Sequence, residues 1–363
     1  MRIGIHGSCI VNNELWFSLS HMNGICRLNL DKGEIQYVTS VPHEDMLSEY
    51  LYSDIQVHDN KLILAPFNAH DIVIFDTKNY EIRKIRVTTE KLRRKLDWES
   101  GNMFYSTTIV GDNAYFIPYR FPGIARLDLE SEEIYYLDDW MDNFFNEYDN
   151  ARIFFREDIA EGRKEQGFWF VSLYYNAIMK YDTNTDKVFC IKKRDAGLRK
   201  GYSCISRSDD RFYLVYSMKS EIHVCDLDFT VMEKVKINNR ISQDIPIDFI
   251  GSITFENYLF LVPYASNKLV RFNMGDNSIC DIKVWYTEYP YYTGFWVYKN
   301  ELFCYGNYKI DAYDMFDGSY RTIYIETESN KKVIADICSK NNMILNEDST
   351  IGLKNFLGFL CGF

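Results

Sequence analysis

The sequence predicts an all-β fold, a seven-bladed β-propeller of four-stranded antiparallel blades, with eight blades as the alternative. Three observations lead to this prediction: a repeated strand-like hairpin, a constant spacing inside that hairpin, and an aromatic content of 16%. Repeats of ~40–50 residues that contain only strand-like segments are typical of propeller blades. Flat side chains suit the layers between blades, so we expect most of the aromatic residues to belong to the core.

The hairpins align on the first apolar residue of their leading strand. These anchors are Leu15, Leu62, Ala114, Phe168, Phe212, Leu259 and Leu302, so that successive repeats are 43 to 54 residues apart. In the first six repeats a bulky residue follows 13 positions after the anchor: Leu28, Phe75, Leu127, Tyr181, Cys225 and Phe272. The seventh repeat reaches Tyr313 after 11 positions. A constant offset inside a repeat of variable length predicts a fixed hairpin with loops that vary outside it.

Each predicted strand has a characteristic pattern. The leading strands are apolar at consecutive positions, as in residues 168–171 and 259–262, which predicts burial on both faces between neighbouring blades. Inner strands are expected before the anchors, for example at 54–58, 104–110 and 295–298, and outer strands at 81–86 and 187–191. Short helical turns are expected only at 90–96 and 355–360.

We expect one propeller domain over residues 1–363, because the repeats run almost from end to end. Propellers avoid an open sheet edge by pairing strands from opposite ends of the chain. The apolar run 333–338 is therefore predicted to be a closing strand beside residues 2–5. Residues 339–363 lack the repeat pattern and are predicted to form a closing or capping tail.

The amino-acid composition indicates the cellular compartment and disfavours some classes of binding partner. No apolar stretch resembles a signal peptide or a membrane span, and the nine cysteines are scattered without a CxxC pair. Free thiols in a reducing cytoplasm fit this pattern better than a disulfide framework. The formal net charge of −11 disfavours nucleic acid and anionic membranes as partners.

The long loops are predicted to lie on one face, at residues 39–53, 88–102, 138–150, 193–201 and 238–246. Binding residues concentrate on loops that a rigid scaffold holds, so this loop-rich face is the predicted binding site. The candidates are aromatic, basic, acidic and histidine residues at the ends of the second strands, in the turns beside them, or at the start of inner strands. They are His21, Phe67, His70, Tyr119, Arg120, Arg152, Tyr174, Tyr202, Asp248, Tyr264 and Tyr292. For the Asn and His residues, a purely turn-forming role is the alternative.

Histidines gather in the first 70 residues, where five of the six occur. His21, His43 and His70 are all expected on the loop-rich face near Glu44 and Asp45, which raises the alternative of a transition-metal site. No HxH or HExxH spacing supports a metal, and no GxSxG, P-loop or GxGxxG motif is present. No cofactor is therefore expected.

The hairpin at residues 60–64 and 71–77 resembles the blades of NHL, Kelch and streptogramin-lyase-like propellers. The resemblance covers about residues 3–338. Residues 65–69 and 117–122 also resemble a set of uncharacterised bacterial propeller proteins. Resemblance to streptogramin lyases implies metal-assisted elimination with His and Glu on late blades, but His223 is the only histidine after residue 70, so this implication is not carried over.

Two classes of function remain. The first is a binding or scaffold propeller that recognises a peptide, a protein or a small polar ligand on the loop-rich face. The alternative is an enzyme, a lyase or a tailoring hydrolase, with His21, His70, Arg120 and Asp248 as candidates in a central pocket. The absence of a catalytic motif favours the first class.

Overall fold

The structure is a computed structural model. It describes residues 4–92, 101–143, 154–156, 167–173, 177–192, 201–216, 219–239, 247–286, 289–306, 309–324 and 327–340.

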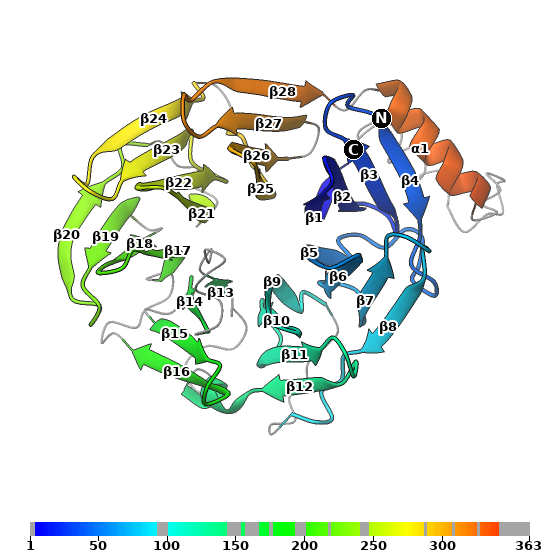
Figure 1. Cartoon of the computed structure of the whole chain (residues 1–363), viewed down its shortest axis with the longest axis horizontal. Helices are drawn as coiled ribbons and strands as arrows, with labels where there is room; N and C mark the ends of the chain where they lie inside the picture. The colour runs from blue at the N-terminus through cyan, green and yellow to red at the C-terminus, as the bar shows by residue number, and fades with distance from the viewer. Residues whose placement is uncertain are drawn as a thin grey trace. The chain divides into compact units, whose positions relative to one another are not determined.

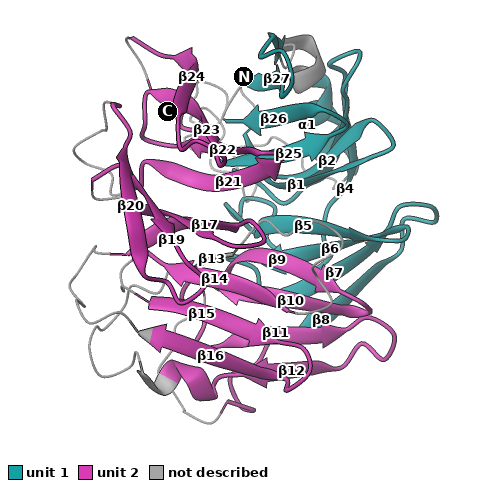
Figure 2. Ribbon diagram, turned by 60° about the vertical axis from the view of Figure 1, so that its left-hand side comes forward, with its two compact units in different colours: residues 1–86, 293–363 teal, residues 87–292 magenta. Residues whose placement is uncertain are grey.

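The described strands form seven four-stranded antiparallel sheets, and in each sheet the strands follow one another in chain order (Figure 1). The fold is an all-β seven-bladed propeller, as the repeat predicted. We number the blades 1 to 7 along the chain. The chain divides into two compact units, residues 1–86 with 293–363 and residues 87–292 (Figure 2).

Unit 1 contains blades 1, 2 and 7 and one helix. Blade 1 comprises β1 (Ile5–Val11), β2 (Glu14–Leu19), β3 (Ile25–Asn29) and β4 (Ile35–Thr39). Blade 2 comprises β5 (Tyr52–His58), β6 (Lys61–Pro66), β7 (Asp71–Asp76) and β8 (Ile82–Arg86). Blade 7 comprises β25 (Gly294–Tyr298), β26 (Glu301–Tyr305), β27 (Lys309–Asp314) and β28 (Tyr320–Tyr324), and α1 (Thr327–Lys340) follows it.

Unit 2 contains blades 3 to 6. Blade 3 comprises β9 (Phe104–Val110), β10 (Asn113–Pro118), β11 (Ile124–Asp128) and β12 (Ile134–Leu137), followed by a short 3-10 helix (Asp139–Asn143). Blade 4 comprises β13 (Phe154–Arg156), β14 (Phe168–Ser172), β15 (Ala177–Asp182) and β16 (Lys187–Lys192). Blade 5 comprises β17 (Tyr202–Arg207), β18 (Phe212–Tyr216), β19 (Glu221–Cys225) and β20 (Val231–Lys236). Blade 6 comprises β21 (Phe249–Phe255), β22 (Tyr258–Pro263), β23 (Lys268–Asn273) and β24 (Ile279–Val284).

The constant offset in the sequence is a register pair in the structure. Each anchor on a second strand lies directly opposite its predicted partner on the third strand, as in Leu15 with Leu28 and Leu62 with Phe75. The other five pairs obey the same rule, including Leu302 with Tyr313 across the tighter turn of blade 7. The seven predicted hairpins are therefore confirmed, with their register.

Second strands are buried on both faces, whereas outer strands are partly exposed. Leu62, Ile63 and Leu64 of β6 are all fully buried, but every residue of the outer strand β8 is at least partly exposed. Seven cysteines are free thiols, and five of these are buried; the seven are Cys9, Cys26, Cys190, Cys204, Cys225, Cys280 and Cys304. No helix within the described ranges is long and apolar enough to span a membrane.

The predicted closure by strand exchange is wrong. Residues 333–338 belong to helix α1, and blades 1 and 7 each form their four strands from consecutive segments. Val333 and Ile337 are buried while Lys332 and Ala335 are exposed, which is a helical spacing rather than the alternation of a strand. The apolar run was misread because its helical period is hidden by Ile334 and Cys338.

Blades 7 and 1 instead join by side-by-side packing within unit 1. Thr293 Oγ1 donates a hydrogen bond to the Ile5 carbonyl at 3.3 Å, and the Trp296 indole donates one to the Ser8 carbonyl. Helix α1 lies along β4 and places Val333 and Ile337 in the core that the two blades share (Figure 1). The helix thus covers an outer strand edge that would otherwise face solvent.

Replacing Ile337 with Ala tests this role of the helix. Ile337 is fully buried, so Ile337→Ala should lower the free energy of unfolding by about 2–5 kcal/mol through lost burial and a residual cavity. Urea unfolding measures the change, and the exposed control Lys332→Ala should stay within about 0.5 kcal/mol of the wild type. Equal small effects of both variants would show that α1 does not stabilise the blades.

Candidate functional site

Two of the predicted residues, His21 and Phe67, come together in a chain of aromatic contacts on unit 1. Phe67 contacts the His6 ring edge-to-face at 5.6 Å between centroids, His6 contacts Tyr50 at 5.1 Å, and Tyr50 contacts His21 at 5.6 Å. His21 Nδ1 lies 3.6 Å from a carboxylate oxygen of Glu49. We call these five residues the ring cluster.

The members of the ring cluster come from four separate segments of the chain. His6 lies on β1, His21 in the β2–β3 turn, Glu49 and Tyr50 in the β4–β5 connection, and Phe67 in the β6–β7 turn. Tyr50 and Glu49 are 37% and 60% exposed, and His21 is 41% exposed. The cluster therefore offers ring surface and a carboxylate to solvent on a scaffold of packed strands.

Backbone hydrogen bonds fix these segments to one another. The Tyr50 amide donates to the Ser20 carbonyl at 2.8 Å, and the Phe67 amide donates to the Leu51 carbonyl at 2.7 Å. The Asn68 side chain donates to the Glu49 carbonyl at 2.9 Å. Tyr50 has a φ of 52°, a left-handed conformation that is uncommon for a bulky residue. The surrounding bonds hold it there.

Blades 1 and 2 approach closely beside the ring cluster. A Cβ atom on Gly7 of β1 would lie 2.6 Å from the backbone nitrogen of Asp54 on β5, so only glycine fits at this point. Ser18 on β2 also donates a hydrogen bond to the Tyr52 carbonyl at 3.0 Å. These contacts place His6 and the start of β5 next to each other.

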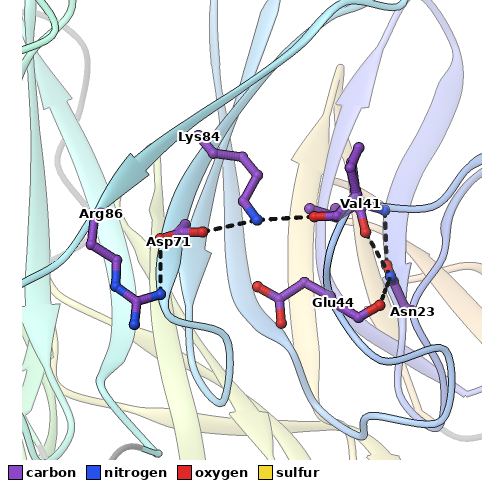
Figure 3. Close-up of polar contacts among 7 residues, drawn as sticks. Asn23, Val41, Glu44, Asp71, Lys84 and Arg86 are labelled. Atoms are coloured by element: carbon purple, nitrogen blue, oxygen red, sulfur yellow. Dashed lines mark hydrogen bonds and ion pairs between the residues drawn. The ribbon is translucent and has the colours of Figure 1, made fainter.

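A buried asparagine anchors the connection that carries Glu49 and Tyr50 (Figure 3). The Asn23 amide nitrogen donates to the carbonyls of Val41 and Glu44 at 2.8 and 3.1 Å, and its side-chain oxygen accepts the Val41 amide at 2.9 Å. The Asn23 backbone amide donates to the Met46 carbonyl at 3.0 Å. Asn23 is 1% exposed, so it acts as an internal brace for residues 41–46.

A charged group braces the same connection from blade 2 (Figure 3). Lys84 on β8 donates to the Pro42 carbonyl at 2.9 Å and pairs with Asp71 at 2.9 Å. Arg86 pairs with the other oxygen of Asp71 at 3.3 Å. The Asp71 side chain is 10% exposed, and two cations compensate its burial.

His70 lies in this second group rather than in the ring cluster. Its backbone amide donates to the Glu44 carboxylate, and its imidazole lies close enough to favour the charged form of that group. Desolvation nevertheless raises the pKa of Glu44, against the effect of Lys84. His21 and His70 thus have different carboxylate neighbours, at opposite ends of one connection.

The alternative of a metal site through His21, His43 and His70 gains no support. Across the part of the chain that the structure describes, no three His, Cys, Asp or Glu side chains are placed to hold a metal ion.

Desolvation lowers the pKa of His6 to about 4, and the nearby His21 ring acts in the same direction. A backbone hydrogen bond with Tyr52 opposes this shift only in part. The His6 Nδ1 atom is shielded from solvent. The middle of the ring cluster is therefore uncharged at neutral pH.

In unit 2, Tyr119 and Tyr264 occupy the position that Phe67 holds in unit 1. Each follows the proline that ends a second strand, and each donates its amide to the carbonyl before the inner strand, at 2.8 Å to Met103 or to Asp248. Both tyrosines are half-buried against another tyrosine, Tyr105 at 6.2 Å and Tyr291 at 5.6 Å. A proline followed by an aromatic residue thus forms a recurring turn at the end of second strands.

Three further predicted residues in unit 2 are buried. Tyr202 is 3% exposed and its hydroxyl lies 3.3 Å from His223 Nδ1. Asp248 is fully buried and accepts hydrogen bonds from the Ser220 hydroxyl and the Phe249 amide. Tyr292 is also fully buried, with its ring 5.9 Å from that of Trp285. Their burial indicates a role in holding the blades.

The other predicted residues are less informative. Arg120 is exposed in the β10–β11 turn of unit 2, and its backbone amide bonds the Met103 carbonyl at 3.2 Å. Arg152 and Tyr174 lie outside the described residues.

Sequence reasoning missed His6, Glu49 and Tyr50. Two signals pointed toward them: the enrichment of histidine before residue 70, and the long connection predicted at 39–53. Neither signal shows which side chains meet, because the contacts depend on how blades 1 and 2 pack.

Comparison with known proteins identifies the family. The family described as "Domain of unknown function (DUF4221)" matches residues 12–253, which is more than half of the chain. The chain belongs to this family. No curated protein matches it.

Solved structures similar to this member of the DUF4221 family share its fold at low sequence identity. Virginiamycin B lyase from Staphylococcus aureus is 14% identical with a TM-score of 0.60, over 84% of this chain and 94% of the lyase. YCF48, solved bound to a D1 peptide, is 9% identical with a TM-score of 0.55, over 84% and 89%. The WD40 repeats of RRP9 are 7% identical with a TM-score of 0.58, over 85% and 88%. The resemblance to streptogramin lyases is confirmed as one of fold.

The shifted pKa of His6 predicts a pH-dependent stability. Its folded-state pKa of about 4 lies below the usual 6.5, so the stabilisation is present above pH 6.5 and is lost as the pH falls toward 4. This contribution is about 3 kcal/mol at most. His6→Gln should remove that part of the pH dependence of urea unfolding between pH 7 and 4.

A second variant serves as the control. His43 is exposed and has a left-handed φ of 66°, a conformation that asparagine tolerates. His43→Asn should therefore keep the pH dependence of the wild type. If His6→Gln kept it too, the imidazole of His6 would not be held neutral by burial.

Proposed function

We propose that this protein is a binding propeller that recognises a peptide, or a polar ligand with a similar end group, through the ring cluster of unit 1. One observation carries the proposal: four rings and a carboxylate from four segments form a continuous, partly exposed chain. Each ring contact is edge-to-face, with interplanar angles of 70–72°. Partly exposed aromatic side chains on a rigid support are typical of binding hot spots.

The braces behind the cluster support this proposal. Asn23 and Lys84 hold the connection before Glu49, and Tyr50 is held in a left-handed conformation by its bond to Ser20. A site whose backbone is already ordered loses little conformational entropy when a ligand binds. The arrangement therefore favours recognition by a preformed surface.

The alternative of a lyase or hydrolase has weaker support. Of its four candidate residues, Asp248 is buried and bonded to Ser220 and the Phe249 amide, while His21 and His70 adjoin different carboxylates. A catalytic base needs to reach both its substrate and an orienting partner. Because propellers serve both enzymes and peptide-binding proteins, fold similarity to a lyase and to YCF48 with its peptide leaves both classes open.

A peptide-binding screen tests the proposal. The wild-type protein is applied to an immobilised library of random decapeptides, and the best binders are measured by calorimetry. Tyr50→Asn removes the ring but keeps a residue that tolerates a left-handed φ, and Phe67→Ala removes a second ring. Each variant should weaken binding by about tenfold or more, as expected for an aromatic hot spot.

The control is an aromatic residue of unit 1 outside the cluster. Tyr324 on β28 is 72% exposed, so Tyr324→Ala removes a similar exposed surface. It should leave affinity unchanged, and circular dichroism should show that all three variants fold. Peptides that bind the wild type and both cluster variants equally well would contradict the proposal.

A further inference from the structure

We propose that the ring cluster selects a cationic group, an ammonium or a guanidinium, at the end or on a side chain of its peptide ligand. This inference rests on the proposed function and adds the chemical class that the site prefers. The observation that carries it is the charge around the cluster.

The segments that build this face are acidic. Residues 20–24, 40–51 and 67–71 contain Glu44, Asp45, Glu49 and Asp71, and they contain no lysine or arginine. Lys84 and Arg86 approach from β8, and both pair with Asp71. The charge of Glu49, at the other end of the connection, is not compensated by these two cations. An uncompensated carboxylate attracts positively charged ligands.

Glu49 has capacity for a further partner. Its carboxylate contact with His21 is 3.6 Å, which is longer than a hydrogen bond, and the side chain is 60% exposed. A bound ammonium or guanidinium can reach this carboxylate from solvent without displacing a buried contact. The pair would form at the edge of the ring cluster, beside Tyr50.

The rings favour the same class of ligand. A cation above an aromatic face is attracted by the ring quadrupole, and Tyr50 exposes part of its ring next to Glu49. His6, which lies between Phe67 and Tyr50 in the ring cluster, is neutral at pH 7 and adds no repulsive charge. The cluster thus combines the Glu49 carboxylate with the aromatic rings of Tyr50 and Phe67, as cation-binding aromatic sites do.

A matched peptide series tests the preference. The best decapeptide from the screen is resynthesised with a single lysine, arginine, citrulline or norleucine at its anchoring position, each with a free or an acetylated amino terminus. Binding should require at least one positive charge, so that the acetylated citrulline and norleucine peptides bind about tenfold more weakly. Comparison of the peptides shows whether lysine, arginine or the terminal ammonium supplies the positive charge that binding requires.

Substitution of Glu49 completes the test. Glu49→Gln should weaken the binding of cationic peptides by about tenfold and leave the binding of neutral peptides unchanged. Raising the salt concentration should reduce the preference for cationic peptides in the wild type but not in Glu49→Gln. Glu34→Gln makes the same charge change at an exposed position in the β3–β4 turn and should have no effect.

The outcomes separate the two proposals. If neutral or acidic peptides bind as tightly as cationic ones and still depend on Tyr50, the ring cluster is a binding site and the preference for cations is wrong. Unchanged affinity of cationic peptides for Glu49→Gln would overturn the preference as well. If no peptide depends on Tyr50, both proposals fail.

Discussion

The direct pairing of one residue on the second strand with one on the third underlies every blade. In Leu62 with Phe75, or Leu259 with Phe272, both partners are fully buried, so a shift of register by one residue would turn the core side of the strand outward. The spacing between the partners is therefore constrained, whereas the connections between blades are free to change in length. The hairpins therefore form a constant scaffold, and the blades differ mainly in the loops that connect them.

The same register determines where the second strand ends, and with it the geometry of the site. Three aromatic residues come directly after the last paired residue of a second strand: Phe67, Tyr119 and Tyr264. The backbone amide of each donates a hydrogen bond to the carbonyl of the residue just before the inner strand of the same blade. At the matching position blade 1 has Ser20, whose backbone amide donates a hydrogen bond to the Gly4 carbonyl. The Ser20 carbonyl accepts a hydrogen bond from the Tyr50 amide. The aromatic ring beside blade 1 thus comes from the β4–β5 connection rather than from the repeated turn.

Local pattern was sufficient to predict the blades, but only part of the site. The hairpins and their register follow from spacing along the chain, and His21 and Phe67 were selected because they lie at or beside the ends of second strands. Helix α1 was missed because Val333 to Cys338 is apolar at nearly every position, so that its period was not evident. His6, Glu49 and Tyr50 could not be selected from the sequence, since their contacts arise only when β1 packs against β5 at Gly7.

The repeat is also broken at the ring cluster, where the ring beside blade 1 comes from the β4–β5 connection. Tyr50 has a φ of 52° and lies beside the exposed Glu49 carboxylate, and two braces of different chemistry hold this connection. Asn23 acts through buried neutral hydrogen bonds, and Lys84, which is paired with Asp71, acts through a hydrogen bond to the Pro42 carbonyl. A strained and exposed conformation persists only where the surroundings enforce it, and such positions cluster at binding sites. Under the proposed function, the strained backbone at Tyr50 and its contact with the neutral His6 keep a ligand surface preformed.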